Sequence, residues 1–156
     1  MKHIQAPNKY KVTKGYKVFL AGSIEMDKAE KWQDYVVSQL GDCSNSLVLL
    51  NPRRDDWDSS WEQKKTNEKF SEQVKWELNA MQDAELVVFY FAPETVSPIS
   101  LMELGYMASD NIVVCCPEGF QRKGNVDIFC EVNGIHMVDS LDDLIAYVRE
   151  ETKYIK

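Results

Sequence analysis

The sequence lacks several features that would place it in a large protein class. Among its 156 residues, no apolar run approaches the roughly 20 residues of a membrane-spanning helix. Residues 1–17 are polar, carry lysines and have no apolar core, so they do not match a secretory signal. No repeat, low-complexity tract or flexible linker divides the chain. We therefore expect a single cytoplasmic domain over residues 1–156, with residues 1–16 as an N-terminal extension and no contact with a membrane.

Metal ligands and positive charge are also scarce. The two histidines, His3 and His136, lie far apart, and the four cysteines lack the spacing of a zinc site. Buried free thiols in a reducing compartment explain these cysteines. A net charge of −7 argues against broad binding to DNA or RNA, which needs a basic face. We expect no metal, no cofactor and no nucleic-acid partner, although local backbone N–H groups can still hold a small anion.

Short apolar runs alternate with longer amphipathic segments, and the 44% hydrophobic content suits a folded globular domain. The pattern predicts strands at residues 17–21, 47–50, 86–91, 112–116 and 135–138, and helices at residues 27–40, 66–81, 99–109, 124–131 and 141–150. Continuously apolar strands are typical of a parallel sheet covered on both faces. With right-handed crossovers, the predicted fold is an α/β, five-stranded parallel sheet in the flavodoxin-like or Rossmann-like order 2-1-3-4-5, with helices on both faces.

This order predicts a binding site between the first and third strands, where the strand order reverses. Gly22 and Ser23 follow the first of these strands, and Gly22 lets the backbone approach a ligand closely. The Ser23 hydroxyl and nearby N–H groups suit a sugar hydroxyl or a phosphate. The other interpretation is a tight turn in which Ser23 only caps the next helix.

One acid, Glu103, lies in the mostly small and apolar segment of residues 97–106, just after the predicted central strand. A carboxylate in a partly apolar cleft needs a reason, because removing a charge from water is costly. Catalysis is one reason. A glutamate on a helix surface that points to solvent is the other interpretation.

Two polar loops leave alternatives open. The loop at residues 53–65 contains Trp57 and Trp61, which could form a lid, stack on a nucleobase or contact a neighbouring subunit. The opposite charges in this loop equally suit a solvated surface network. The loop at residues 119–127 is either a plain turn or a segment that reaches a site on the same chain or on a symmetry mate.

Taken together, several motifs resemble the nucleoside 2-deoxyribosyltransferase family, which includes the 2′-deoxynucleoside 5′-phosphate N-hydrolases. The general motifs are Phe19-Leu20-Ala21-Gly22-Ser23-Ile24 and Met102-Glu103-Leu104-Gly105-Tyr106. Further motifs are most similar to the branch called nucleoside 2-deoxyribosyltransferase-like: Asn51-Pro52-Arg53-Arg54, Trp76-Glu77-Leu78, Cys116-Pro117-Glu118-Gly119-Phe120 and Gly124-Asn125-Val126-Asp127. The resemblance covers residues 17–138. It implies a five-stranded parallel α/β fold and a homodimer or higher homo-oligomer whose sites are completed by a neighbouring subunit.

The resemblance also implies the chemistry. Glu103 matches the family's nucleophile, which attacks the anomeric carbon of a 2′-deoxynucleoside or deoxynucleotide and displaces the base. The glutamyl-deoxyribosyl ester is then resolved by a second base in a transferase, or by water in a hydrolase. The expected partner is therefore a small deoxynucleoside or deoxynucleotide, and the expected enzyme cleaves an N-glycosidic bond.

Other substrate-binding positions follow from the same resemblance. Ser23 and Ser97 match two serines of the phosphate-binding hydrolase branch, and the Gly22 turn precedes the first of them. Asn51 falls near a base-contacting position. Asn125 and Asp127 fall where a neighbouring subunit contributes polar groups to the sugar or phosphate end.

Three residues depart from the family pattern. Phe19 stands where a tyrosine commonly hydrogen-bonds the nucleophile, and Glu25 stands where the hydrolase branch has an arginine, so it would repel a phosphate. Gln73 stands at the base-facing aspartate, with Glu72 and Glu77 nearby as substitutes. These departures keep two alternatives open: a non-catalytic nucleotide-binding module, and a glycohydrolase of an NAD-like dinucleotide.

Overall fold

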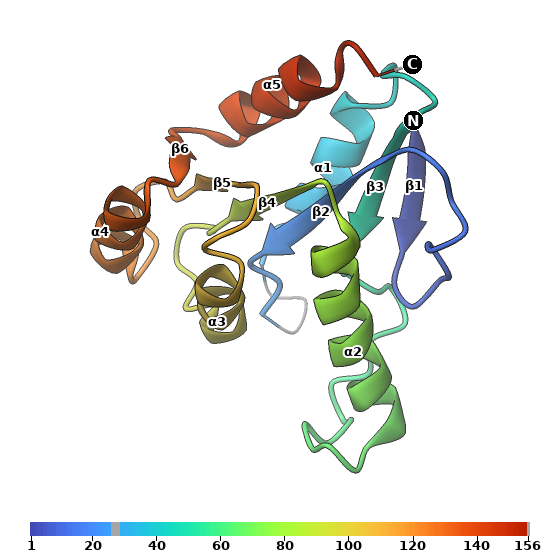
Figure 1. Cartoon of the computed structure of the whole chain (residues 1–156). Helices are drawn as coiled ribbons and strands as arrows, with labels where there is room; N and C mark the ends of the chain where they lie inside the picture. Colours follow the sequence, from blue (N-terminus) through green and yellow to red (C-terminus); the bar gives the residue numbers. More distant parts are fainter. Residues whose placement is uncertain (26–28, 156) are drawn as a thin grey trace.

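Figure 1 shows the computed structural model, which describes residues 1–25 and 29–155. These residues form a six-stranded, all-parallel sheet with helices on both faces. The strands are β1 (Lys2–Gln5), β2 (Tyr16–Gly22), β3 (Leu47–Asn51), β4 (Leu86–Tyr90), β5 (Ile112–Cys115) and β6 (His136–Val138). The helices are α1 (Trp32–Gln39), α2 (Glu68–Asp83), α3 (Pro98–Tyr106), α4 (Lys123–Asn133) and α5 (Leu141–Thr152).

The strand order is β1-β3-β2-β4-β5-β6. Its last five strands confirm the predicted order 2-1-3-4-5, so the order reverses between β2 and β4 as expected. The prediction of five strands is wrong, because β1 adds a sixth strand at the edge, beside β3. The sequence of β1 is polar and the strand is half exposed, so it carries no apolar run that would reveal it. Part of the expected N-terminal extension is therefore built into the sheet.

Two apolar layers enclose the sheet, as the continuously apolar strands predict. On one face α2, α3 and α4 pack through residues such as Trp76, Leu104 and Val126. On the other face α1 and α5 pack through residues such as Trp32 and Leu144. This division follows from right-handed crossovers, because the chain moves one way from β2 to β3 and the other way from β3 onward.

The first helix, α1, begins later than the sequence predicts. The helix predicted from residue 27 begins at Trp32, and residues 27 and 28 lie outside the described part of the chain. The Trp32 indole N–H donates to the backbone oxygen of Ser23 at 3.0 Å. This bond holds the segment after β2 close to the sheet edge before the helix starts.

The buried face of α2 also differs from the apolar stripe in its sequence. The sequence predicts an apolar stripe of Phe70, Val74, Leu78 and Met81; Met81 is fully buried, but the other three are only partly buried. The buried residues are Gln73, Trp76, Ala80 and Met81. A polar side chain, Gln73, therefore faces inward from the middle of this helix.

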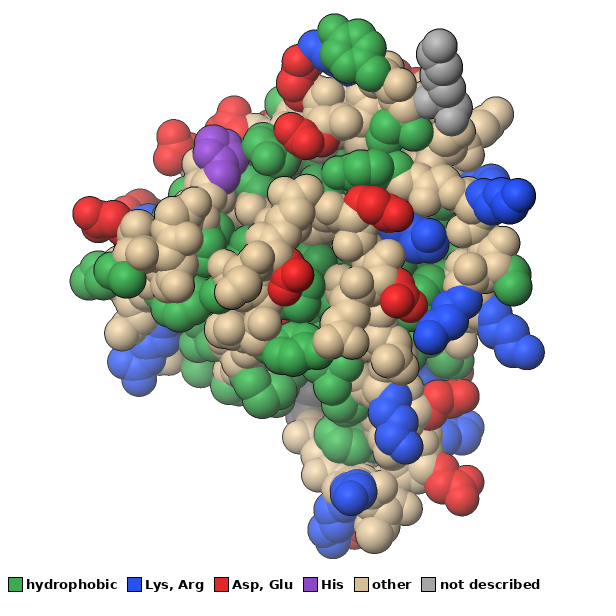
Figure 2. All heavy atoms as spheres, viewed as in Figure 1, with side chains coloured by type: hydrophobic (Ala, Val, Ile, Leu, Met, Phe, Trp, Pro, Cys, Tyr) green, Lys and Arg blue, Asp and Glu red, His purple; other side chains and the backbone are tan. Residues whose placement is uncertain are grey.

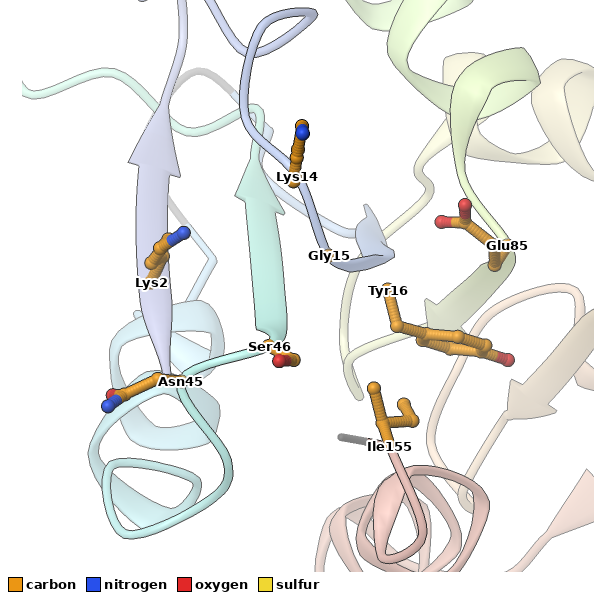
Figure 3. Close-up of a pocket in the computed structure, with 8 residues that line it drawn as sticks. All are labelled: Lys2, Lys14, Gly15, Tyr16, Asn45, Ser46, Glu85 and Ile155. Carbon is orange, nitrogen blue, oxygen red and sulfur yellow. The ribbon is translucent and has the colours of Figure 1, made fainter.

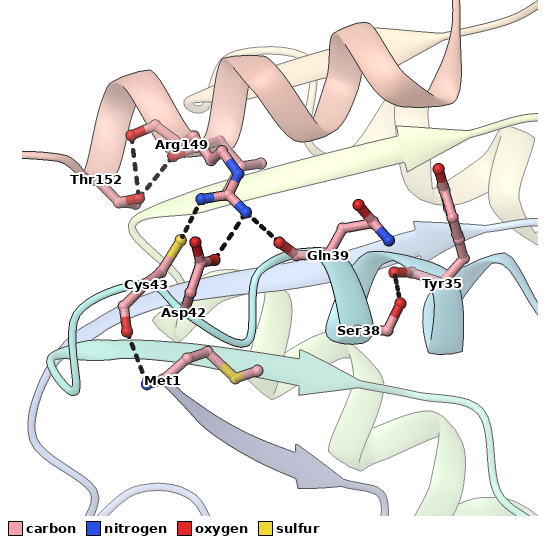
Figure 4. A network of polar contacts seen from close by, with 9 residues as sticks. Met1, Tyr35, Ser38, Gln39, Asp42, Cys43, Arg149 and Thr152 are labelled. Carbon is pink, nitrogen blue, oxygen red and sulfur yellow. Dashed lines mark hydrogen bonds and ion pairs between the residues drawn. The ribbon is translucent and has the colours of Figure 1, made fainter.

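A polar network joins the ends of α1 and α5 on the opposite face, as Figure 4 shows. The Arg149 guanidinium donates to Asp42 at 2.7 Å and to the backbone oxygen of Gln39. The amino group of Met1 donates to the backbone oxygen of Cys43 at 3.0 Å, which anchors the start of β1. None of the described helices is long and apolar enough to cross a membrane.

Gly22 is required where β2 meets β4. Its φ is 139°, and a Cβ atom there would lie 2.1 Å from the backbone oxygen of Tyr90. We expect Gly22→Ala to lower the free energy of unfolding by about 2 kcal/mol or more, measured by urea denaturation. The matched control is Gly124→Ala in α4, where a Cβ atom meets nothing within 4 Å. Equal stability of the two variants would contradict this account of Gly22.

Candidate active site

The candidate site lies at the carboxyl ends of the strands, around the point where the strand order reverses. The turn after β2 contributes Ser23 and Glu25, and the loop after β4 contributes Thr95 and Ser97. Glu103 comes from α3, the helix that follows this loop. The structure thus brings the two predicted loops together.

Three buried hydroxyl groups join the two loops. The Oγ atoms of Ser23 and Ser97 are 2.7 Å apart, and the Thr95 Oγ1 atom lies 2.9 Å from the first and 3.0 Å from the second. The Ser23 Oγ also accepts from the Ala92 N–H at 2.9 Å, and the Thr95 hydroxyl donates to the Ala92 oxygen at 2.8 Å. Sequence reasoning missed Thr95; its position, two residues before Ser97 in the same loop, was the available signal.

Glu25 links the same loops from outside the hydroxyl cluster. Its Oε1 atom accepts from the backbone N–H groups of Val96 and Ser97, both at 2.6 Å. Ser97 has left-handed backbone angles, φ 43° and ψ 55°, and immediately precedes α3. Successive N–H groups in such a turn point toward one anion, so the carboxylate is well placed to receive both.

Glu103 is buried on α3, with 7% of its surface exposed. Among the described residues, its carboxyl group has no hydrogen-bond partner. Burial, and to a smaller extent the nearby Glu77 carboxylate, raises the pKa of Glu103 to about 8. An acid with a pKa this far from its ordinary value, set by burial and one charged neighbour, is typical of functional sites.

Glu77 acts electrostatically on Glu103 from α2, and Gln73 of the same helix binds Glu77. The Gln73 Nε2 donates to Glu77 at 2.7 Å and to the backbone oxygen of Pro52 at 2.8 Å. Burial raises the pKa of Glu77 to about 7, while the hydrogen bond from Gln73 lowers it. The Gln73 Oε1 is buried without a partner in the described part of the chain. The two acids therefore form an interacting pair between α2 and α3.

The remaining predicted residues lie elsewhere. Asn51 is buried at the end of β3, where its Nδ2 lies 3.2 Å from His3 and its Oδ1 accepts from the Arg53 N–H at 2.9 Å. These contacts hold the edge of the sheet. Asn125 is exposed on α4, and Asp127 pairs with Lys123 at 2.9 Å. No described contact joins Asn125 or Asp127 to Glu103 of the same chain.

Two surface pockets formed by described residues do not include Glu103. The one drawn in Figure 3 is lined by Lys2, Gly15, Tyr16 and Glu85 among others, near the amino ends of β1, β2 and β4, at the opposite edge of the sheet. The other lies between α1 and the start of α5, with Tyr90 in its lining. The candidate site is distinct from both pockets and is marked by the interacting acids Glu77 and Glu103.

The protein is an α/β protein with a parallel sheet. Its buried glutamate, Glu103, lies near the point where the strand order reverses, which is where such sheets usually have their active sites. The sequence model described as "Nucleoside 2-deoxyribosyltransferase like" matches residues 15–120, well over half of the chain. The protein belongs to the nucleoside 2-deoxyribosyltransferase-like family. No curated protein matches the chain in sequence.

Solved structures share the fold. A conserved protein from Enterococcus faecalis V583 matches with a TM-score of 0.60 at 14% identity, covering 88% of this chain and 99% of its own. The CMP N-glycosidase of Clostridium botulinum matches with a TM-score of 0.53 at 14% identity, covering 85% of this chain and 97% of its own. At such identities, both comparisons establish the α/β fold alone.

The burial of Glu103 predicts a stability that depends on pH. Its pKa rises from an ordinary 4.5 to about 8, so between these values the folded state keeps a proton that the unfolded state loses. Stability attributable to this group therefore falls as pH rises through that window. We expect Glu103→Gln to be more stable than the wild type, by at least about 1 kcal/mol at pH 8, with a smaller difference at pH 5.

Urea denaturation across this pH range measures the effect. The control is Glu151→Gln, because Glu151 is exposed on α5, on the opposite face of the sheet. That variant should stay within about 0.5 kcal/mol of the wild type at every pH. A Glu103→Gln protein that is less stable than the wild type at pH 8 would show that the ionised carboxylate has partners and is not isolated.

Proposed function

We propose that the protein is an enzyme that cleaves the N-glycosidic bond of a 2′-deoxynucleoside or deoxynucleotide, with Glu103 as the nucleophile. The observation that carries this proposal is the buried carboxyl group of Glu103, which has no hydrogen-bond partner among the described residues. Membership of the nucleoside 2-deoxyribosyltransferase-like family supports it. So does the similarity in fold to a CMP N-glycosidase.

In the first step, ionised Glu103 attacks C1′ of the sugar. The bond between C1′ and the base nitrogen breaks, and its electron pair leaves with the base, which takes up a proton. Glu77, whose charge acts on Glu103, is suited to donate it, because its pKa of about 7 keeps it partly protonated at neutral pH. Because the pKa of Glu103 is higher than that of Glu77, the shared proton lies mostly on Glu103, and the reactive form, with its charge on Glu103 and its proton on Glu77, is the less populated of the two singly protonated forms.

In the second step, the glutamyl-deoxyribosyl ester is resolved. Attack of water on C1′ gives free deoxyribose, and attack of a second base gives a new nucleoside; both regenerate the Glu103 carboxylate. The covalent intermediate divides one difficult displacement into two easier ones. Lack of a 2′-hydroxyl makes the oxocarbenium-like transition state easier to reach, which favours deoxy substrates.

Phe19 favours a second candidate, a nucleotide-binding module without catalysis. Its side chain is buried in β2, with its ring centroid 6.2 Å from that of Trp76. It has no hydroxyl group that could orient Glu103. The retained Glu103 favours the enzyme, and the following experiment separates the two functions.

Glu103→Ala and Glu103→Gln should abolish base release, because no other described acid would replace the nucleophile. Nucleoside binding should stay within about tenfold of the wild type, or roughly 1.4 kcal/mol. Chromatography of reactions with a panel of deoxynucleosides and their 5′-monophosphates measures base release, and Glu151→Gln serves as the control. Unchanged base release in both Glu103 variants excludes it as nucleophile, and no release by the wild type from any substrate favours the binding module.

The same reactions separate a transferase from a hydrolase. When a second free base is added, a transferase yields a new deoxynucleoside. A hydrolase yields only the free sugar and the original base.

We further propose a homodimer or higher homo-oligomer in the cytoplasm. The four free cysteines support a reducing compartment. Ile99, Met102 and Tyr106 of α3 are 58%, 60% and 49% exposed, and Ile128 and Val132 of α4 are 64% and 79% exposed. Both helices pack on the same apolar layer, and Figure 2 shows hydrophobic side chains gathered over them. Exposed large apolar side chains on two helices of the same face support a protein interface.

Val132→Glu, alone or with Ile128→Glu, should shift the protein to a smaller species, because a buried unpaired charge is costly at an interface. Light scattering coupled to gel filtration measures the mass. Val12→Glu is the matched control, since Val12 is 88% exposed but lies outside α3 and α4. A wild type that is monomeric at all concentrations would refute the proposed oligomer.

A further inference from the structure

The loop before α3 is built to hold an anion, and the chain supplies that anion itself. The N–H groups of Val96 and Ser97 converge on one oxygen of Glu25, at 2.6 Å each. The next residue, Pro98, is the first residue of α3 and has no N–H to add. Hydrogen bonds from N–H groups to a carboxylate are among the stronger ones in proteins. Glu25 therefore occupies the anion position of this loop.

The second carboxylate oxygen of Glu25, Oε2, does not take part in these two hydrogen bonds. Among the described residues no hydrogen bond reaches its Oε2 atom, and Glu25 is only partly buried. The hydroxyls of Ser23, Thr95 and Ser97 next to it are bonded to one another and to Ala92. The loop thus offers a free, negatively charged acceptor, which suits a hydroxyl donor and repels a second anion.

This acceptor lies toward one end of the proposed site. Ser97 precedes Glu103 by six residues, or about 9 Å along α3. Glu77, the proposed proton donor to the base, approaches Glu103 from α2, so the base lies on that side. In a nucleoside the base is attached to C1′ and C5′ to C4′, on the two sides of the ring oxygen. A sugar with C1′ at Glu103 and its base toward α2 therefore extends its C5′ substituent toward the loop before α3.

We infer that Glu25 selects substrates with a free 5′-hydroxyl and rejects 5′-monophosphates. This inference rests on the proposed function and deepens it by naming the substrate class. A 5′-hydroxyl donates to the free Oε2 of Glu25. A 5′-phosphate meets a carboxylate of like charge, and can gain the two N–H groups only by displacing it.

The test compares kcat/KM for a 2′-deoxynucleoside and the 5′-monophosphate of the same nucleoside. The wild type should prefer the nucleoside by at least about tenfold. Glu25→Gln keeps the shape of the side chain without its charge, and Glu25→Ala removes the side chain. Both variants should raise the ratio of monophosphate to nucleoside kcat/KM by at least about tenfold. A wild type that prefers the monophosphate, or a ratio that neither variant changes, overturns the inference.

Glu94→Gln is the matched control, because it removes the same charge from the same loop. Glu94 is exposed, also has a positive φ, and has no described side-chain contact. Its substrate ratio should stay within about threefold of the wild type. An equal rise in this variant would show a general effect of charge and overturn the specific role of Glu25.

A binding measurement keeps the inference separate from the proposed catalysis. Calorimetry with 2-deoxyribose 5-phosphate and with 2-deoxyribose needs no turnover. Glu25→Gln should bind the phosphorylated sugar at least about tenfold more tightly than the wild type does, with less change for the unphosphorylated sugar. If the wild type cleaves no substrate, the proposed function fails, and this binding comparison still decides the role of Glu25. Equal affinity of both proteins for the phosphorylated sugar refutes that role.

Discussion

Burial of the Glu103 side chain, whose carboxyl group has no hydrogen-bond partner among the described residues, is the constraint on which the site depends. A stability argument alone would place a hydrophobic residue at this position of α3, whose neighbour Leu104 belongs to the apolar core. Burial instead disfavours the ionised form and raises the pKa of the acid. A poorly solvated carboxylate is also a more reactive one, so the feature that weakens the fold suits nucleophilic attack.

The surrounding structure makes this arrangement possible by fixing the start of α3 from two strands. Gly22 brings the end of β2 against β4 so closely that no side chain fits between them. The hydroxyls of Ser23 and Ser97 then join the two loops, and the Ser100 hydroxyl donates to the Gly22 oxygen at 2.8 Å. Because α3 is held in this way, Glu103 is positioned by backbone and hydroxyl contacts and needs no direct partner of its own.

Strands whose side chains are buried on both faces could be predicted from the sequence, as could the amphipathic helices and the more exposed strand β6. The apolar runs of β2 to β5 mark the sheet and its order, and the placement of Ser23, Ser97 and Glu103 near its switch point follows from that order. The polar strand β1 could not be found, because an edge strand is recognised by its backbone partner rather than by its composition. Asn51 suggested a ligand contact, yet its hydrogen bonds hold that same edge.

Periodicity failed on α2 for a related reason. Its apolar stripe predicts a buried face made of hydrophobic residues. The buried face instead contains Gln73, and Glu77 beside it is partly buried. A helix that lines a site must present polar groups inward, so its hydrophobic pattern is displaced from the true interior. From the sequence, Glu25 only replaces an arginine of the related hydrolases. The folded loop shows that its carboxylate binds two backbone N–H groups.

Three carboxyl groups around one candidate site therefore differ both in burial and in hydrogen bonding. One oxygen of Glu25 is held by two backbone N–H groups, and Glu77 receives one bond from Gln73. Glu103 receives none from the described residues. The two N–H groups hold the Glu25 carboxylate in place, which suits binding, whereas no hydrogen bond restrains the Glu103 carboxyl group, which suits attack. The singly bonded group between these extremes suits proton transfer, because small changes in its surroundings move its pKa across neutrality.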